Sequence, residues 1–118
     1  MSVKINHEIG VITISNEVIA KVAGLAASDC YGVVGMAVKN VKDGIVHLLK
    51  KDSLAKGVRV FEEEDGIKIE FHIIVEYGTN IPAIAETVSN TVKYRVEEAT
   101  ELKVKGISIF VEGIRVDN

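Results

Sequence analysis

A chain of 118 residues fits one domain of ordinary size, and 47% hydrophobic with 26% charged residues excludes a disordered composition. The net charge of -3 weighs against a general affinity for nucleic acid, which needs a basic surface. No uncharged run approaches the ~18 residues of a membrane span, and the first eight residues lack the apolar core of a signal peptide, so we expect membrane association only through a partner.

The first half of the chain predicts one strand and two helices. Residues 10–14 are a glycine followed by four β-branched residues, as in a strand, and Ser15 is a suitable N-cap for a helix that ends near Cys30. Gly32 and Gly35 then interrupt the chain. Residues 38–49 carry apolar side chains at helical spacing with lysines on the polar side, which predicts a second amphipathic helix.

The second half predicts a hairpin, a long helix and a final strand. A tight turn at Asp65-Gly66 separates two strands, and alternation along residues 67–77 predicts one buried and one wet face. Pro82 suits the first turn of a helix whose apolar stripe runs to Ala99, and residues 102–116 read as a strand.

The resulting order, β-α-α-β-β-α-β, predicts a single α+β domain over residues 1–118. We expect a two-layer sandwich in which an antiparallel-rich sheet carries helices on one face, similar in layout to a KH module.

The reactive side chains form no pattern of a catalytic or metal site. His7, His47 and His72 are scattered along the chain without partners at metal-ligand spacing. Cys30 is the lone cysteine, which is typical of a reducing cytoplasm, and we expect it to be a buried filler at the end of the first helix. The sequence therefore predicts a protein that binds other molecules, with no enzymatic activity, cofactor or metal.

The segment from Gly32 to Lys42 is the candidate interaction site, and it has two interpretations. A G-x-x-G loop between two helices clamps single-stranded nucleic acid in KH modules, although the two intervening residues here are valines. Alternatively, some of its apolar residues pack in the core, and those left exposed form a patch for self-association or a partner, flanked by lysines. The candidate residues are Gly32, Val33, Val34, Gly35, Met36, Lys39 and Lys42.

Several segments taken together point to a known family. They are Gly10–Ser15, Gly32–Met36, Ile69–Gly78, Ile81–Glu97 and Val111–Ile114. Their order and spacing resemble the alkaline shock protein family, also described as the envelope stress response family of Gram-positive bacteria. The resemblance implies a small cytoplasmic protein that self-assembles, is linked to envelope or alkaline stress, and has no family catalytic residues.

The leading hypothesis is thus a non-catalytic interaction or scaffold protein. The resemblance implies that it forms homo-oligomers and docks on an envelope-linked, membrane-anchored protein, so that it is cytoplasmic but peripheral at the membrane through that partner. The alternative is a KH-like module that binds single-stranded RNA through Gly32-Val33-Val34-Gly35.

Overall fold

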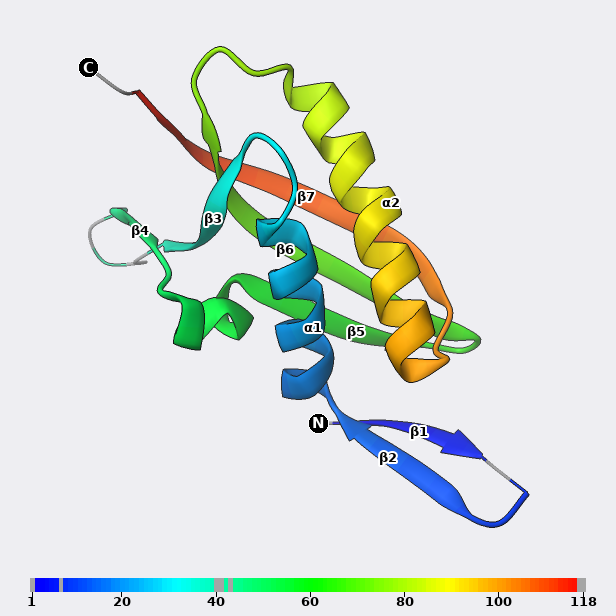
Figure 1. The fold of residues 1–118 in the computed structure, drawn as a ribbon. Coiled ribbons are helices and arrows are strands. Elements are labelled where there is room, and N and C mark those ends of the chain that lie inside the picture. The colour runs from blue at the N-terminus through cyan, green and yellow to red at the C-terminus, as the bar shows by residue number, and fades with distance from the viewer. Residues whose placement is uncertain (1, 7, 40–41, 43, 117–118) are drawn as a thin grey trace.

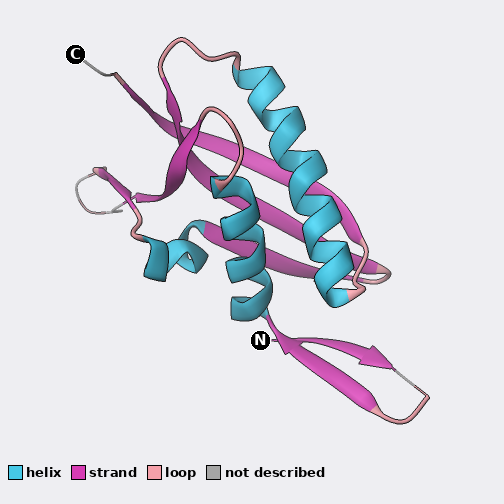
Figure 2. Cartoon of the chain, viewed as in Figure 1, coloured by secondary structure: helices cyan, strands magenta, loops and turns pink. Residues whose placement is uncertain are grey.

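The computed structural model describes residues 2–6, 8–39, 42 and 44–116 of the chain. These residues form two α-helices, seven strands and a 3₁₀ segment that is kinked at Ser53 (Figures 1 and 2). In chain order the elements are β1 (Ser2–Asn6), β2 (Val11–Ser15), α1 (Asn16–Ser28), β3 (Val33–Lys39), β4 (Val46–Leu48), η1 (Lys51–Gly57), β5 (Val58–Glu63), β6 (Gly66–Glu76), α2 (Ile81–Thr100) and β7 (Val104–Arg115).

The main sheet is organised around β6, its long central strand. One edge of β6 pairs in parallel with β7 along nearly its whole length. The other edge pairs antiparallel with β5 over its first half and with β3 over its second half, and β4 extends the sheet beyond β3. Both helices lie on the same face of this sheet (Figure 1), so the predicted two-layer α+β architecture is confirmed.

The core lies between the helices and the sheet, as the alternation in the sequence predicted. Every second residue of β6 from Ile67 to Val75 is at most 1% exposed, because strand side chains point alternately to the two faces. Along α2, four residues spaced four apart face this row. They are Ile84, Val88, Val92 and Val96.

Both helices begin where the sequence predicted, α1 after its predicted cap Ser15 and α2 around Pro82, while the cap of α2, Asn80, was not predicted. The backbone N–H of Val18 donates to the Ser15 hydroxyl at 3.2 Å, which caps α1. The N–H of Ala83 donates to the side-chain oxygen of Asn80 at 3.1 Å, and Pro82 lies in the first turn of α2 as expected. Neither α1 nor α2, nor any other helix among the described residues, is both long and apolar enough to cross a membrane.

The predicted second helix is wrong, and with it the expected β-α-α-β-β-α-β order. Residues 33–39 and 46–48 are strands that pair antiparallel with each other, and Gly44 between them has a φ of +71°, which stops a right-handed helix. Val41, part of the expected helical stripe, lies outside the described residues. Residues 33–39 form a strand and not a helix because they pair with the second half of β6, whose backbone groups need hydrogen-bond partners on that edge.

A separate hairpin precedes α1. The sequence predicted β2 but not β1, and the two pair antiparallel with Val3 opposite Ile14 and Ile5 opposite Ile12. Figure 1 shows this hairpin extending beyond the end of the helix-and-sheet body. The described chain is accordingly elongated, with extents of 56 × 31 × 23 Å.

Candidate functional site

Gly32, the first residue of the predicted interaction segment, has a packing role. Its φ is +87°, and a Cβ at this position would lie 2.5 Å from Cδ1 of Ile84 in α2. Its carbonyl accepts a hydrogen bond from the N–H of Glu76 at 2.9 Å. The glycine therefore lets the α1–β3 connection pass close against the start of α2.

The valines and the methionine of the segment are drawn into the fold to different degrees. Met36 is fully buried in the core, so it cannot be part of the exposed patch that was one expectation for this segment. Val33 is half-buried opposite Val75, and the half-buried Val34 lies at an irregularity where β3 changes register against β6. Core packing, the other interpretation, is thus confirmed for Met36.

The remaining predicted residues do not form a loop between helices. Gly35 is buried on β3, where a Cβ would lie 3.0 Å from Cδ1 of Leu48. Lys39 ends β3, and Lys42 is exposed in the connection to β4. Because the Gly32–Gly35 segment starts a strand, it lacks the placement between two helices on which the RNA-binding alternative depended.

Cys30 is the buried filler that the sequence predicted. It is 8% exposed, and its thiol donates to the carbonyl of Ala26 one helical turn earlier at 3.5 Å. This contact ties the thiol to α1, and the histidine of β6, His72, contacts two glutamates. In the part of the chain that the structure describes, no three His, Cys, Asp or Glu side chains are grouped as a metal site.

The face of the main sheet turned away from the helices carries a mixed apolar and charged surface. Strand register places Phe110 of β7 opposite His72, and Phe61 of β5 opposite Lys68, on this face. Leu48 of β4 reaches it over Gly35, which is opposite Ile74. Figure 1 shows both α-helices on the other side. We call this the open face, made up of Leu48, Arg59, Phe61, Lys68, Glu70, His72, Ile74, Phe110 and Glu112.

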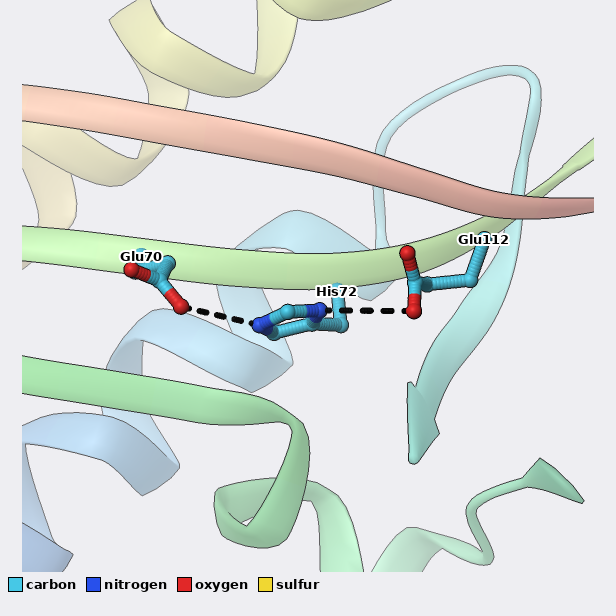
Figure 3. A network of polar contacts seen from close by, with 3 residues as sticks. All are labelled: Glu70, His72 and Glu112. Atoms are coloured by element: carbon cyan, nitrogen blue, oxygen red, sulfur yellow. Dashed lines mark hydrogen bonds and ion pairs between the residues drawn. The ribbon is translucent and has the colours of Figure 1, made fainter. Parts of the chain in front are cut away.

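His72 is the centre of the open face and lies between two carboxylates (Figure 3). Its Nε2 lies 2.9 Å from Oε1 of Glu70, two residues away on the same strand, and its Nδ1 lies 3.7 Å from Oε2 of Glu112 on β7. The ring stacks on Phe110, with centroids 5.0 Å apart and planes 11° apart. Glu112 reaches His72 because the β6–β7 register shifts beside it.

The chemistry of this cluster favours positively charged neighbours, and the chain itself places one nearby, because Arg59 of β5 lies opposite Glu70 in the strand register. The neutral imidazole has a single N–H donor and can serve only one carboxylate, whereas the imidazolium donates from both nitrogens. Whether the imidazole is neutral or charged, two carboxylates contact a single ring. The side chains of Glu70, His72 and Glu112 are only 20–28% exposed. Partly buried carboxylates gain from an added cation more than fully exposed ones do.

A second surface feature lies on the helix layer, around Tyr94 of α2. Asn90, Lys93, Glu97 and Glu98 line a shallow hollow beside it. A hydrogen bond to Glu98, with the charge of that carboxylate, raises the pKa of the Tyr94 phenol above its usual value. The hollow is formed by successive turns of one helix, so it offers few convergent groups.

Comparison with known families identifies the chain. Residues 4–116 match the model of the alkaline shock protein 23 family, which is described as having a cell envelope-related function. The chain belongs to this family. The resemblance seen in the sequence is therefore confirmed over nearly the whole chain.

Relatives within the family include proteins of similar length. YloU of Bacillus subtilis, described as uncharacterised, is 49% identical over all of this chain and 99% of its own length. Spy1614 of Streptococcus pyogenes, also uncharacterised, is 37% identical over 98% of this chain and 97% of its own length. A longer S. pyogenes protein named a stress response regulator Gls24 homolog is 28% identical over 90% of this chain and 59% of its own length.

Among solved structures, a variant of the MamM CTD is similar in shape, with a TM-score of 0.47 and 16% identity. The match covers 86% of this chain and 95% of that one. The likeness is too distant to carry over any property.

Sequence reasoning missed the open face for an identifiable reason. The alternation along β6 already placed Glu70 and His72 on one wet face. Phe110 and Glu112 lie on the same face only because β7 pairs in parallel with β6. The paired residues are about 40 positions apart in the chain, so no local pattern shows this neighbourhood. The apolar side chain of Ile74 on the predicted wet face was the one local sign that this face is not merely solvated.

Proposed function

We propose that this chain is a non-catalytic interaction protein of the envelope stress response, which associates with itself and docks on an envelope-linked protein through its open face. One observation carries the proposal: Leu48, Phe61 and Phe110 remain 45–49% exposed around the Glu70–His72–Glu112 cluster. Aromatic side chains are enriched at protein interfaces, whereas carboxylates are depleted at interface centres, so Glu70 and Glu112 would need partners of opposite charge there.

The open face also defines the chemistry of its partner. Complete burial of a large apolar side chain is worth about 1.5–3 kcal/mol, so the half-exposed Phe61 and Phe110 offer a useful part of that to an apolar segment. The two carboxylates beside His72 favour a Lys or Arg in that segment. We therefore infer a partner segment with apolar side chains and at least one basic residue.

The family supports the biological setting of this proposal. The matched family is described as cell envelope-related, and one relative is named as a stress response regulator homolog. The buried, locally bonded thiol of Cys30 supports the non-catalytic part, because a reactive cysteine needs exposure and a thiolate-stabilising neighbour.

Affinity purification from the native cell, quantified by mass spectrometry, tests the docking surface. The double substitution Phe61→Ser with Phe110→Ser removes two aromatic rings that are each 45% exposed on the open face, and Tyr94→Ser removes a ring from α2 that is 59% exposed. We expect the envelope-linked partner to be recovered at least tenfold less with the double variant and unchanged with Tyr94→Ser. Equal recovery with wild type and the double variant, both shown to be folded by thermal unfolding, would contradict docking through this face.

The electrostatic part has its own test. Glu70→Gln with Glu112→Gln preserves the shape of both side chains and removes their charge. We expect this variant to weaken partner binding and to reduce the sensitivity of binding to salt, because fewer charges then contribute to the complex. An unchanged salt dependence would show that the partner brings no cation to the cluster.

A further inference from the structure

The N-terminal hairpin presents a strand edge that lacks the usual protection against pairing. Unpaired edges are ordinarily blocked by charged residues, prolines or bulges, because they can otherwise add a strand from another chain. Residues Val11–Ser15 of β2 are Val, Ile, Thr, Ile and Ser, which are uncharged and nearly all β-branched. Such a sequence has a high propensity to form a strand and contains nothing to discourage a partner.

Other strand edges of the described chain are protected by comparison. β7 carries Lys105 and Glu112 beside two register irregularities, β1 has Lys4 at its middle, and β5 carries Arg59 with two glutamates. β4 is only three residues long. The absence of protection is thus specific to β2, which indicates that its edge is covered when the protein functions.

The hairpin is anchored to the body through only part of its surface: Val3 is 5% exposed in the core, and Ile5 and Ile14 pack against that core. β2 pairs with β1 on one edge, and the described residues supply no strand to its other edge. Ile12 is 50% exposed and Val11 is 60% exposed, and the preceding Ile9 is 94% exposed. A two-stranded hairpin is marginally stable in water unless it gains further strands or packs against a helix. The exposed aliphatic residues mark the part of this hairpin that its own chain leaves uncovered.

The sequence of β2 is complementary to itself. In antiparallel pairing about Thr13, that residue lies opposite its own copy, and Ile12 lies opposite Ile14. Within each copy, Ile12 is already opposite Ile5, and Ile14 is opposite Val3. Joining two copies would therefore make two rows across the four strands, each with four aliphatic side chains on the same face of the sheet. An interface related by a two-fold axis requires this kind of self-complementarity.

Charge selects the edge through which the copies join. With β2 in the centre, the two Lys4 side chains lie on outer strands, about 14 Å apart at a strand spacing of about 4.8 Å. That distance exceeds the screening length of about 8 Å at physiological salt, so their repulsion is small. Equivalent pairing through β1 about Lys4 would place like charges directly opposite each other, which is destabilising.

We propose that two copies of this chain join through β2, pairing antiparallel about Thr13 to make a four-stranded sheet. The inference rests on the self-association in the proposed function and assigns a surface to it. This surface is separate from the open face, which stays available for a partner.

Charge-swapped variants test the pairing directly. Thr13→Lys and Thr13→Glu each place like charges opposite each other at the two-fold axis, and Thr13→Val keeps an uncharged, β-branched residue as the matched control. Thr13 also lies opposite Lys4 in its own hairpin, so Thr13→Lys adds a repulsion within each copy, and Thr13→Glu is the cleaner of the two charged variants. In sedimentation velocity over a concentration series, we expect each charged variant to raise the dimer dissociation constant at least tenfold, and Thr13→Val to leave it nearly unchanged. An equimolar mixture of the two charged variants should restore association.

Each outcome of this experiment is decisive. If wild type associates and both charged variants associate equally well, pairing through β2 is wrong, while self-association by another surface stands. If the charged variants fail and their mixture does not recover, Thr13 does not lie opposite its own copy, and the proposed register is wrong. A wild type that stays monomeric throughout the series overturns both this inference and the self-association.

A cross-linking experiment is independent of how the charged variants fold. In a Cys30→Ser background, Thr13→Cys should form an inter-chain disulfide on mild oxidation, because directly opposite positions are close enough for a disulfide. The matched Lys4→Cys variant should form none, since its two copies would be about 14 Å apart across three strand spacings. Equal cross-linking at both positions would overturn the pairing about Thr13.

Discussion

Two features of the structure favour glycine at position 32, its backbone conformation and the lack of space for a side chain, and their energetic effects can be measured separately. Its φ of +87° disfavours any other residue, and a Cβ would also meet Ile84 at 2.5 Å. Gly78 has a similar φ of +85° but open space around it, and Gly10 has neither constraint. The three positions therefore separate backbone strain from steric conflict.

We expect Gly32→Ala to lower the free energy of unfolding by more than 2 kcal/mol, because left-handed strain of about 1–2 kcal/mol adds to the conflict with Ile84. Gly78→Ala should lose about 1 kcal/mol from strain alone, and Gly10→Ala should lose almost nothing. Urea unfolding monitored by circular dichroism measures all three. A loss at Gly32 no larger than that at Gly78 would show that Ile84 moves aside without cost.

At this scale the sequence drew attention to Gly32 and Gly35 as parts of a possible interaction site, but it could not reveal their packing role. The Gly-x-x-Gly spacing was visible, and both glycines turned out to matter for packing. Their reasons lie far away in the chain, with Ile84 above Gly32 and Leu48 above Gly35. Spacing alone cannot distinguish a glycine that admits a ligand from one that admits a neighbouring side chain.

Among the elements, the end of α2 has the clearest local cause. Glu101 terminates the helix in the left-handed conformation, with a φ of 62°, and its N–H donates to the carbonyl of Glu97 at 2.8 Å. Helices commonly end this way, but usually with glycine, which adopts this conformation without strain. The N–H of Val104 then donates to the side chain of Glu97 at 2.9 Å, which links the helix to β7.

We expect Glu101→Gly to raise the free energy of unfolding by about 1 kcal/mol, because it relieves the strained left-handed residue. The same exchange inside the helix, Glu86→Gly, should lower it by about 1 kcal/mol, since glycine is a poor residue in a helix interior. Thermal or urea unfolding compares the two variants. Destabilisation by both would mean that the side chain of Glu101 contributes more than its backbone conformation costs.

The elements that the sequence predicted well were those with strong local signals. The Asp65-Gly66 turn, the alternation of β6 and the capped, amphipathic α2 each depend on neighbouring residues. Residues 38–49 were assigned to a helix because apolar side chains in a short segment match more than one period. The pairing of β3 with β6 decided that segment, and no local pattern contains such a long-range contact.

For the whole molecule, two surfaces with different tasks emerge. The open face offers aromatic rings and carboxylates on a rigid sheet, and the hairpin offers an edge at the far end of an elongated body. Only half of the open face could have been predicted, because Glu70 and His72 are neighbours on one strand, whereas Phe110 and Glu112 arrive through the parallel pairing of β7.

Hydrogen exchange should distinguish these two parts of the molecule. Amides of β6 are bonded on both edges within one copy, so we expect strong protection at every protein concentration. Amides of β2 on the edge turned away from β1 have no strand partner within one copy among the described residues, so their protection should appear only as copies associate. Exchange followed by mass spectrometry at low and high protein concentration measures both. Protection of Val11–Ser15 that is already complete in the monomer would mean that its own chain covers this edge, and the hairpin would then be a structural arm with no role in joining copies.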